Sequence, residues 1–212
     1  MKICVLGAGA WGTALAIHLA KSHPTKLWAR NSGHVSGMKK AQSNPLYLGD
    51  FKFPPLLEIS DDFIATLSDV DLIVCAVPTS GFREILKSIK EINQSATVIW
   101  ANKGLEQGSA KLPHEIAFEE LGDPKKTNRD WGVVSGPSFA AELVRSLPTA
   151  LTLASTSKET TKLVANIFHH HNLRVYTSQD AVGVSVGGAL KNVIAIASGI
   201  SDGMGFGNNA RA

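Results

Sequence analysis

The sequence predicts an α/β protein with a Rossmann-like, doubly wound and mostly parallel sheet. Short apolar runs alternate with helical patterns along most of the chain, which implies βαβ units with right-handed crossovers. Most of these runs are continuously apolar, as expected where helices cover both faces of a sheet. The first run also ends in a glycine-rich turn. The predicted strands are 2–7, 25–29, 71–77, 96–101, 131–136, 149–155 and 173–178.

Helices are predicted between these strands, over 10–21, 80–90, 110–121, 138–146 and 159–170. Residues 38–60 contain three prolines and are predicted to form a long irregular loop. After residue 180 no further strand is expected, and 181–200 form one long helical candidate despite four glycines. We therefore expect two domains: a nucleotide-binding domain over 1–180 and, over 181–212, the truncated beginning of a helical domain.

Composition restricts the classes of function. The chain has 212 residues, of which 44% are hydrophobic and 18% charged, enough for a sizeable core. A net charge of +3 suits a protein that handles small anions and is too weak to suggest nucleic acid. Cys4 and Cys75 lie in apolar runs and are predicted to be buried thiols, which favours a reducing, cytoplasmic location. Without a targeting segment or a run of eighteen apolar residues, we expect no membrane span.

The turn after the first strand has the pattern G-x-G-x-x-G, formed by Gly7, Gly9 and Gly12. Its context supports a dinucleotide site, because a buried strand precedes it and an Ala/Leu-rich helix follows. The first glycine permits the turn, the second admits a pyrophosphate and the third lets helix and strand pack closely. The N–H groups at the helix N-terminus would bind the phosphates. A glycine turn without a ligand is the alternative interpretation.

Arg30 follows the second strand, where an acidic residue would bind the ribose 2′-hydroxyl of NAD. An arginine there can pair with a 2′-phosphate, so the sequence favours NADPH over NADH. An exposed arginine at a strand end, without a ligand, is the alternative.

Three further stretches have the residue types of an anion site. Lys103, in ANKG (101–104), lies just past a strand end, where ligands of doubly wound sheets bind. Ser135 and Ser138, in SGPS, follow another strand and could bind a phosphate or cap a helix. Lys191 is the one charge in VGGALKNVIAIASG (186–199). An ammonium among apolar residues either has a functional partner or snorkels to the surface.

The motifs GAGAWGTALA, VPTSGFREIL, ANKGLE, SGPSFAAEL and GGALKNVIAIASGISDGMGFGNNARA together resemble the NAD(P)-dependent glycerol-3-phosphate dehydrogenase family, most closely its bacterial type. The resemblance runs through the whole chain. It implies an oxidoreductase that interconverts dihydroxyacetone phosphate and sn-glycerol 3-phosphate by hydride transfer for phospholipid synthesis. It also implies a Rossmann-like domain followed by a helical domain.

The resemblance assigns roles to individual residues. It makes Lys191 the catalytic lysine, whose ammonium stabilises the ketone oxygen and delivers the proton. The expected substrate contacts are Lys103, Gly136 and Ser138, to which Asn192 is added as a hydrogen-bonding neighbour. The expected cofactor contacts are Gly7, Gly9, Ala10, Trp11, Gly12, Arg30, Phe82, Lys103 and Ala140.

The resemblance also has departures and rivals. Ser185 stands where the family commonly has a carboxylate or amide, and the family's Arg-Asn pair and acidic residue belong to a region after Ala212. The rivals are a dehydrogenase of a hydroxy acid or imine, and a non-catalytic nucleotide-binding module. No metal site is predicted, because the adjacent histidines 169–171 cannot all face one ion. An unfinished helical domain exposes apolar surface, which would suit a homodimer.

Overall fold

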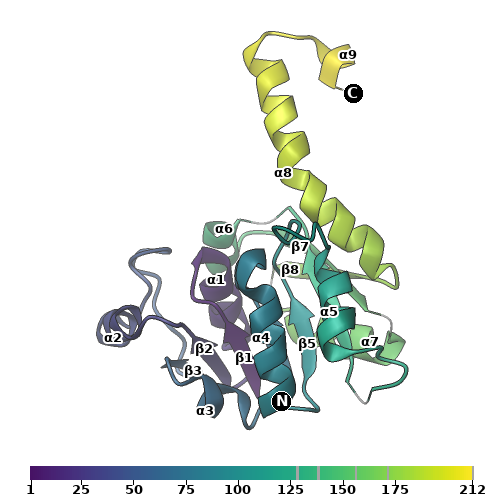
Figure 1. The fold of residues 1–212 in the computed structure, drawn as a ribbon. Helices are drawn as coiled ribbons and strands as arrows, with labels where there is room; N and C mark the ends of the chain where they lie inside the picture. The colour runs from purple at the N-terminus through teal and green to yellow at the C-terminus, as the bar shows by residue number, and fades with distance from the viewer. Residues whose placement is uncertain (128, 138, 156, 171, 212) are drawn as a thin grey trace.

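The computed structural model describes residues 1–127, 129–137, 139–155, 157–170 and 172–211. The fold is an eight-stranded sheet in the order β3-β2-β1-β4-β5-β6-β7-β8 (Figure 1). All neighbouring strands are parallel except β6 and β7, which are antiparallel. The predicted doubly wound, mostly parallel sheet is therefore confirmed. The strands are β1 (Ile3–Leu6), β2 (Thr25–Trp28), β3 (Leu57–Ser60), β4 (Leu72–Cys75), β5 (Thr97–Trp100), β6 (Trp131–Ser135), β7 (Thr149–Ser155) and β8 (Leu173–Ser178).

Helices cover both faces of this sheet, and two hydrophobic clusters result. Strand β1 shows the reason: Ile3 and Val5 point into one cluster, whereas Cys4 and Leu6 point into the other. The first cluster packs under α1, α6 and α7, and the second under α4, α5 and the start of α8. The helices are α1 (Ala10–Leu19), α2 (Ser32–Ala41), α3 (Phe63–Leu67), α4 (Thr79–Ile92), α5 (Pro113–Leu121), α6 (Ala140–Val144), α7 (Lys158–Phe168), α8 (Ala181–Gly203) and α9 (Asn208–Arg211).

The prediction of an irregular loop over 38–60 is wrong at both ends. Helix α2 continues to Ala41, and β3 occupies Leu57–Ser60 as an edge strand. Neither has a strong apolar pattern, because α2 buries only Val35 and Met38 and β3 buries only Ile59. The short α3 and α9 were not predicted either.

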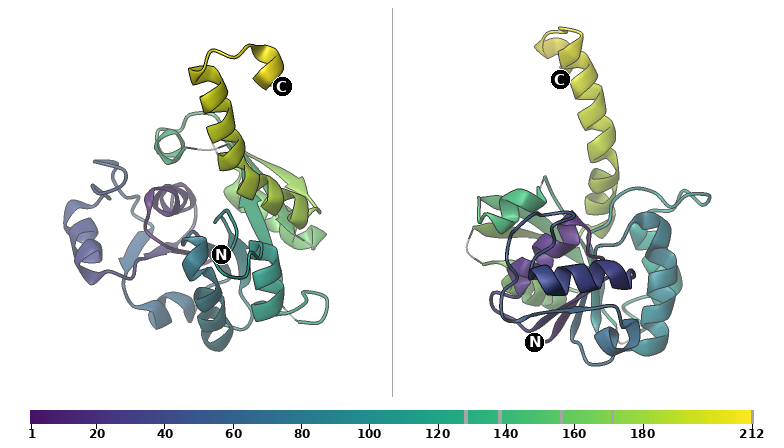
Figure 2. Two further views of the ribbon diagram at one scale, coloured as in Figure 1. Left: turned by 45° about the horizontal axis from the view of Figure 1, so that its top comes forward. Right: turned by 90° about the vertical axis from the view of Figure 1, so that its left-hand side faces the viewer.

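Helix α8 leaves the body of the molecule. Its first turns pack on β6, β7 and α5, and the rest extends away from the sheet toward α9 (Figures 1 and 2). The extending part of α8 and the turn after it expose a set of large apolar side chains, which are Val193, Ile194, Ile196, Ile200, Met204 and Phe206. Within the described residues, α8 is the one helix long and apolar enough to span a membrane, a test that core helices also pass. Its first half lines a cavity of the protein, described below.

Candidate active site

The glycine turn is tightly packed on one side and open on the other. Gly7 has φ of +109°, and a Cβ there would lie 2.8 Å from the Ala76 carbonyl oxygen. A Cβ on Gly12 would lie 1.9 Å from the Gly7 carbonyl oxygen, so α1 packs directly on the turn. A Cβ on Gly9 would meet nothing within 4 Å. The turn is thus closed on its protein side and open on its outer side, at the N-terminus of α1.

Four of the other predicted cofactor residues belong to α1 or to elements that neighbour α1 and β1. Ala10 and Trp11, in the first turn of α1, and Ala140, at the start of α6, are half-buried against the first cluster. Helix α6 packs against α1, which brings Ala140 to this side of the sheet. Arg30 is exposed two residues after β2. Because β2 runs parallel to β1, Arg30 lies at the same edge of the sheet as the glycine turn and can face a ligand there.

Phe82, which the sequence predicted beside the nicotinamide, lies elsewhere. Its side chain is fully buried in the second cluster, with its ring 5.8 Å from that of Trp100 between centroids. A ring enclosed by core side chains has no face left for a cofactor. We therefore correct this assignment: Phe82 packs α4 onto the sheet.

Lys103 lies after β5, next to the turn that follows β6. Its ammonium donates a hydrogen bond to the Gly136 carbonyl oxygen over 3.2 Å, and its own carbonyl accepts one from Thr79 Oγ1 over 2.9 Å. Burial lowers the pKa of Lys103, and the charge of Lys191 lowers it further. Two cations thus share one region of the protein.

Lys191 lines a cavity of about 260 Å³ at this place. Its ammonium also lies 5.9 Å from the centroid of the Phe139 ring. The cavity is open, since Lys191 is half-buried, and its walls come from the β6–α6 turn, β7 and α8. The lining residues are Ser135, Gly136, Pro137, Thr152, Val184, Gly187, Gly188 and Lys191.

Small residues of α8 allow this close approach. A Cβ on Gly188 would lie 2.9 Å from Ser135 Oγ and 3.4 Å from Lys103 Cγ. The glycine therefore lets α8 lie against both β6 and the Lys103 side chain. A Cβ on Gly187 would meet nothing within 4 Å, because that face of the helix borders the cavity.

The structure adds two residues and leaves two predictions undescribed. Thr152 and Val184 line the cavity, although neither lies in a motif; Thr152 is placed there by the antiparallel pairing of β7 with β6, in which it stands opposite Ser135. Ser138 lies outside the described residues, as does the side chain of Asn192.

Two further polar features were raised by the sequence. Ser185 has a buried hydroxyl with no hydrogen-bond partner among the described residues. His169 ends α7 as its C-cap, and His171 lies outside the described residues. In the part of the chain that is described, no group of three or more His, Cys, Asp or Glu side chains could hold a metal ion.

Comparison with known proteins identifies relatives over the whole chain. The family model for the NAD-dependent glycerol-3-phosphate dehydrogenase N-terminus matches residues 2–161, and the model for the C-terminus of the same family matches 180–212. A glycerol-3-phosphate dehydrogenase [NAD(P)+] of Methylobacillus flagellatus is 57% identical over 212 residues. The aligned residues make up 100% of this chain and 63% of that relative, so this chain spans less than two thirds of the relative's length.

Solved structures agree with this match. The crystal structure of glycerol-3-phosphate dehydrogenase from Coxiella burnetii superposes with a TM-score of 0.89 at 40% identity, covering 99% of this chain and 63% of that one. A glycerol-3-phosphate dehydrogenase from yeast, Saccharomyces cerevisiae, superposes with a TM-score of 0.85 at 27% identity, covering 100% of this chain and 65% of that one.

Proposed function

The chain belongs to the NAD-dependent glycerol-3-phosphate dehydrogenase family, and we propose that the protein catalyses the reversible reduction of dihydroxyacetone phosphate to sn-glycerol 3-phosphate. The single observation that carries the proposal is the meeting of Lys103 and Lys191 beside one cavity, at the edge of the sheet that also holds the glycine turn. Two cations there suit a substrate that carries a phosphate and develops charge on its ketone oxygen. The product would serve phospholipid synthesis.

The glycine turn fits NADPH or NADH. The open outer side of Gly9 leaves room for the pyrophosphate, and the N–H groups that begin α1 suit its charge. When bound, the cofactor supplies the hydride. Arg30, exposed after β2, would pair with a 2′-phosphate and so favours NADPH.

Lys191 performs the proton step in this proposal. Its ammonium stabilises the negative charge that develops on the ketone oxygen and donates a proton to it. In the reverse direction the neutral amine accepts the hydroxyl proton of glycerol 3-phosphate. Lys103 and Gly136 contact the substrate in this proposal, and Ser138 and Asn192 are the further expected contacts.

Residues 1–180 form the cofactor domain in this proposal, and 181–212 begin the substrate domain. The exposed apolar side chains of α8 suit burial against further helices, and we propose a homodimer as the assembly. Light scattering tests the homodimer, because it gives the molar mass of the protein in solution. The free thiols of Cys4 and Cys75, buried on adjacent strands, support a reducing compartment such as the cytoplasm.

The test is oxidation of NADPH in the presence of dihydroxyacetone phosphate, run on this chain and on the protein at its full natural length. We expect cofactor binding by both and turnover by the longer one. A panel of hydroxy acids, ketoacids and imines separates this activity from other dehydrogenases. A full-length protein that binds NADPH but turns over none of these substrates would refute the enzyme and favour a binding module.

A further inference from the structure

The loop that carries Lys103 is held to α4 at two points. It runs from Ala101 to Leu112 between β5 and α5. At its beginning, Thr79 Oγ1 donates to the carbonyl of Lys103 and accepts from the Asn102 side-chain nitrogen at 3.3 Å. One helical turn farther along α4, Arg83 reaches Glu106. Residues four apart lie on the same helix face, so one face of α4 contacts the loop on both sides of Gly104.

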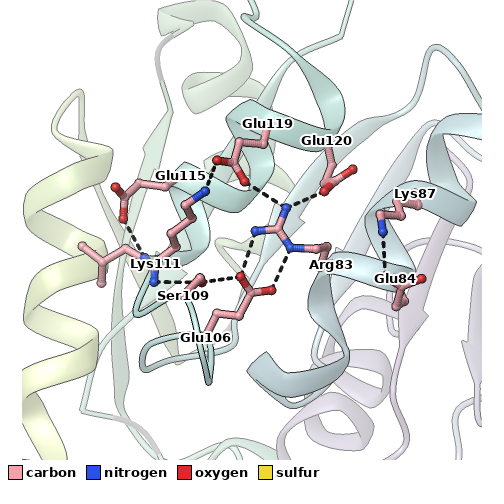
Figure 3. A network of polar contacts seen from close by, with 10 residues as sticks. Arg83, Glu84, Lys87, Glu106, Ser109, Lys111, Glu115, Glu119 and Glu120 are labelled. Carbon is pink, nitrogen blue, oxygen red and sulfur yellow. Dashed lines mark hydrogen bonds and ion pairs between the residues drawn. The ribbon is translucent and has the colours of Figure 1, made fainter.

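Arg83 joins the loop to two helices (Figure 3). Its Nε donates to Glu106 Oε1 and its Nη2 to Glu106 Oε2, both over 2.8 Å. Its Nη1 donates to Glu119 Oε2 over 2.9 Å and also to Glu120, both on α5. The pair with Glu106 is bidentate, a geometry that the planar guanidinium provides and an ammonium does not.

Three members of this cluster are more enclosed than the residues of an ordinary surface ion pair, whereas Glu119 is 39% exposed. The side chains of Arg83, Glu106 and Glu120 are 22%, 15% and 17% exposed. Hydrogen bonds from Arg83 and Ser109 lower the pKa of Glu106 to about 2, so the carboxylate stays ionised at neutral pH. Without Arg83, the carboxylates of Glu106, Glu119 and Glu120 would lie close together. Lys111 is bonded to Glu119 and would remain as a cation beside them. The mutual repulsion of the carboxylates would push the loop outward.

Lys103 needs such support. Its ammonium is partly buried, faces the like charge of Lys191 and hydrogen-bonds to the Gly136 carbonyl. Burial and like charge both favour movement of this side chain into water. The next residue, Gly104, has φ of +100°, so the loop turns sharply there and has no regular structure to keep it in place.

We propose that Arg83 is a positioning residue: by clamping Glu106 against α4 it fixes the loop and thereby holds the Lys103 ammonium beside Gly136 and the Lys191 cavity. The role for substrate rests on the proposed function, in which Lys103 contacts dihydroxyacetone phosphate. The effect on the loop does not depend on it.

The experiment compares three variants of the protein at its full natural length. Arg83→Gln removes the clamp, and Glu106→Gln releases only its loop side, leaving Arg83 bonded to α5. Lys87→Gln is the matched control, since Lys87 pairs with Glu84 on the same helix, is 48% exposed and does not reach the loop in this pairing (Figure 3). Circular dichroism establishes that each variant is folded; if Arg83→Gln does not fold, Glu106→Gln carries the test.

Three readouts follow, of which two need no turnover. We expect amide hydrogen exchange over 101–112 and labelling of Lys103 by an amine-specific reagent to become about tenfold faster in both clamp variants. Neither rate should change in Lys87→Gln. With NADPH saturating, the KM for dihydroxyacetone phosphate should rise about tenfold while the Kd for NADPH changes little.

Two results would overturn the inference. The first is loop exchange and Lys103 labelling in Arg83→Gln and Glu106→Gln equal to those of Lys87→Gln. The second is a faster loop with an unchanged KM, which would reduce Arg83 to a structural role. Failure of the proposed function is distinguishable, because it would show as a wild-type protein inactive on dihydroxyacetone phosphate, whatever the exchange rates are.

Discussion

Replacement of Gly12 by alanine tests the glycine turn most sharply. The new Cβ would lie 1.9 Å from the Gly7 carbonyl oxygen, whereas such contacts essentially never fall below 3.0 Å. The turn and α1 must therefore separate by about 1 Å, an overpacking that costs about 1–3 kcal/mol. Alanine returns about 1 kcal/mol through its higher helix propensity. We expect a net loss of about 0–2 kcal/mol in the free energy of unfolding.

The effect on the cofactor should be larger. A turn displaced by about 1 Å loses at least one charge-assisted hydrogen bond to the pyrophosphate, worth about 1.5–3 kcal/mol. That corresponds to a Kd for NADPH raised about ten- to hundredfold. Calorimetric titration with NADPH gives the Kd, and urea unfolding followed by circular dichroism gives the stability.

Gly37→Ala is the matched control, because Gly37 also lies inside a helix but is exposed, with nothing within 4 Å of an added Cβ. It should gain up to about 1 kcal/mol of stability and keep its NADPH affinity. Wild-type affinity in Gly12→Ala would refute the reasoning, since the turn would then tolerate the displacement that its geometry forbids.

Arg30→Ala should raise the Kd for NADPH about tenfold and leave that for NADH nearly unchanged, because the arginine would pair only with the 2′-phosphate; an unchanged ratio of the two Kd values excludes the role. Since burial lowers the pKa of Lys103 below 10.5, the unfolded chain binds more protons than the folded one just below that pH, and stability should rise with pH there relative to Lys103→Met. Urea unfolding at several pH values measures the difference in unfolding free energy between the wild type and Lys103→Met. If the wild type loses stability relative to the variant as the pH rises in this range, the ammonium is not buried. Phe168→Ala removes a ring that is 1% exposed and should cost about 3–5 kcal/mol in the same assay, whereas a loss under about 1 kcal/mol would mean that α7 is loosely packed.

The buried half of the fold was predictable and the exposed half was not. Strands such as β4 read as continuous apolar runs because helices cover them on both sides. Strand β3 lies at the edge of the sheet and α2 is mostly polar, so neither leaves a strong periodic signal. The glycine turn was also predictable, because its G-x-G-x-x-G spacing lies within one short segment that follows a buried strand.

Contacts between distant segments explain what the sequence missed at the site. Phe82 has the same apolar character whether it faces a cofactor or the core, and only the packing against Trp100 decides between them. Arg83 and Glu106 are 23 residues apart, and no local pattern pairs them. Thr152 reaches the cavity through the pairing of β7 with β6, which is a property of the sheet.

Lys191→Met in the protein at its full natural length tests the central claim most directly. The substitution keeps an unbranched side chain of similar length and removes the ammonium that lines the cavity. NADPH affinity should stay within about twofold of wild type, while kcat for dihydroxyacetone phosphate reduction falls by at least about a hundredfold, as expected for loss of a proton donor. Turnover close to that of the wild type would contradict the claim that this cation meets the oxygen of the reduced ketone.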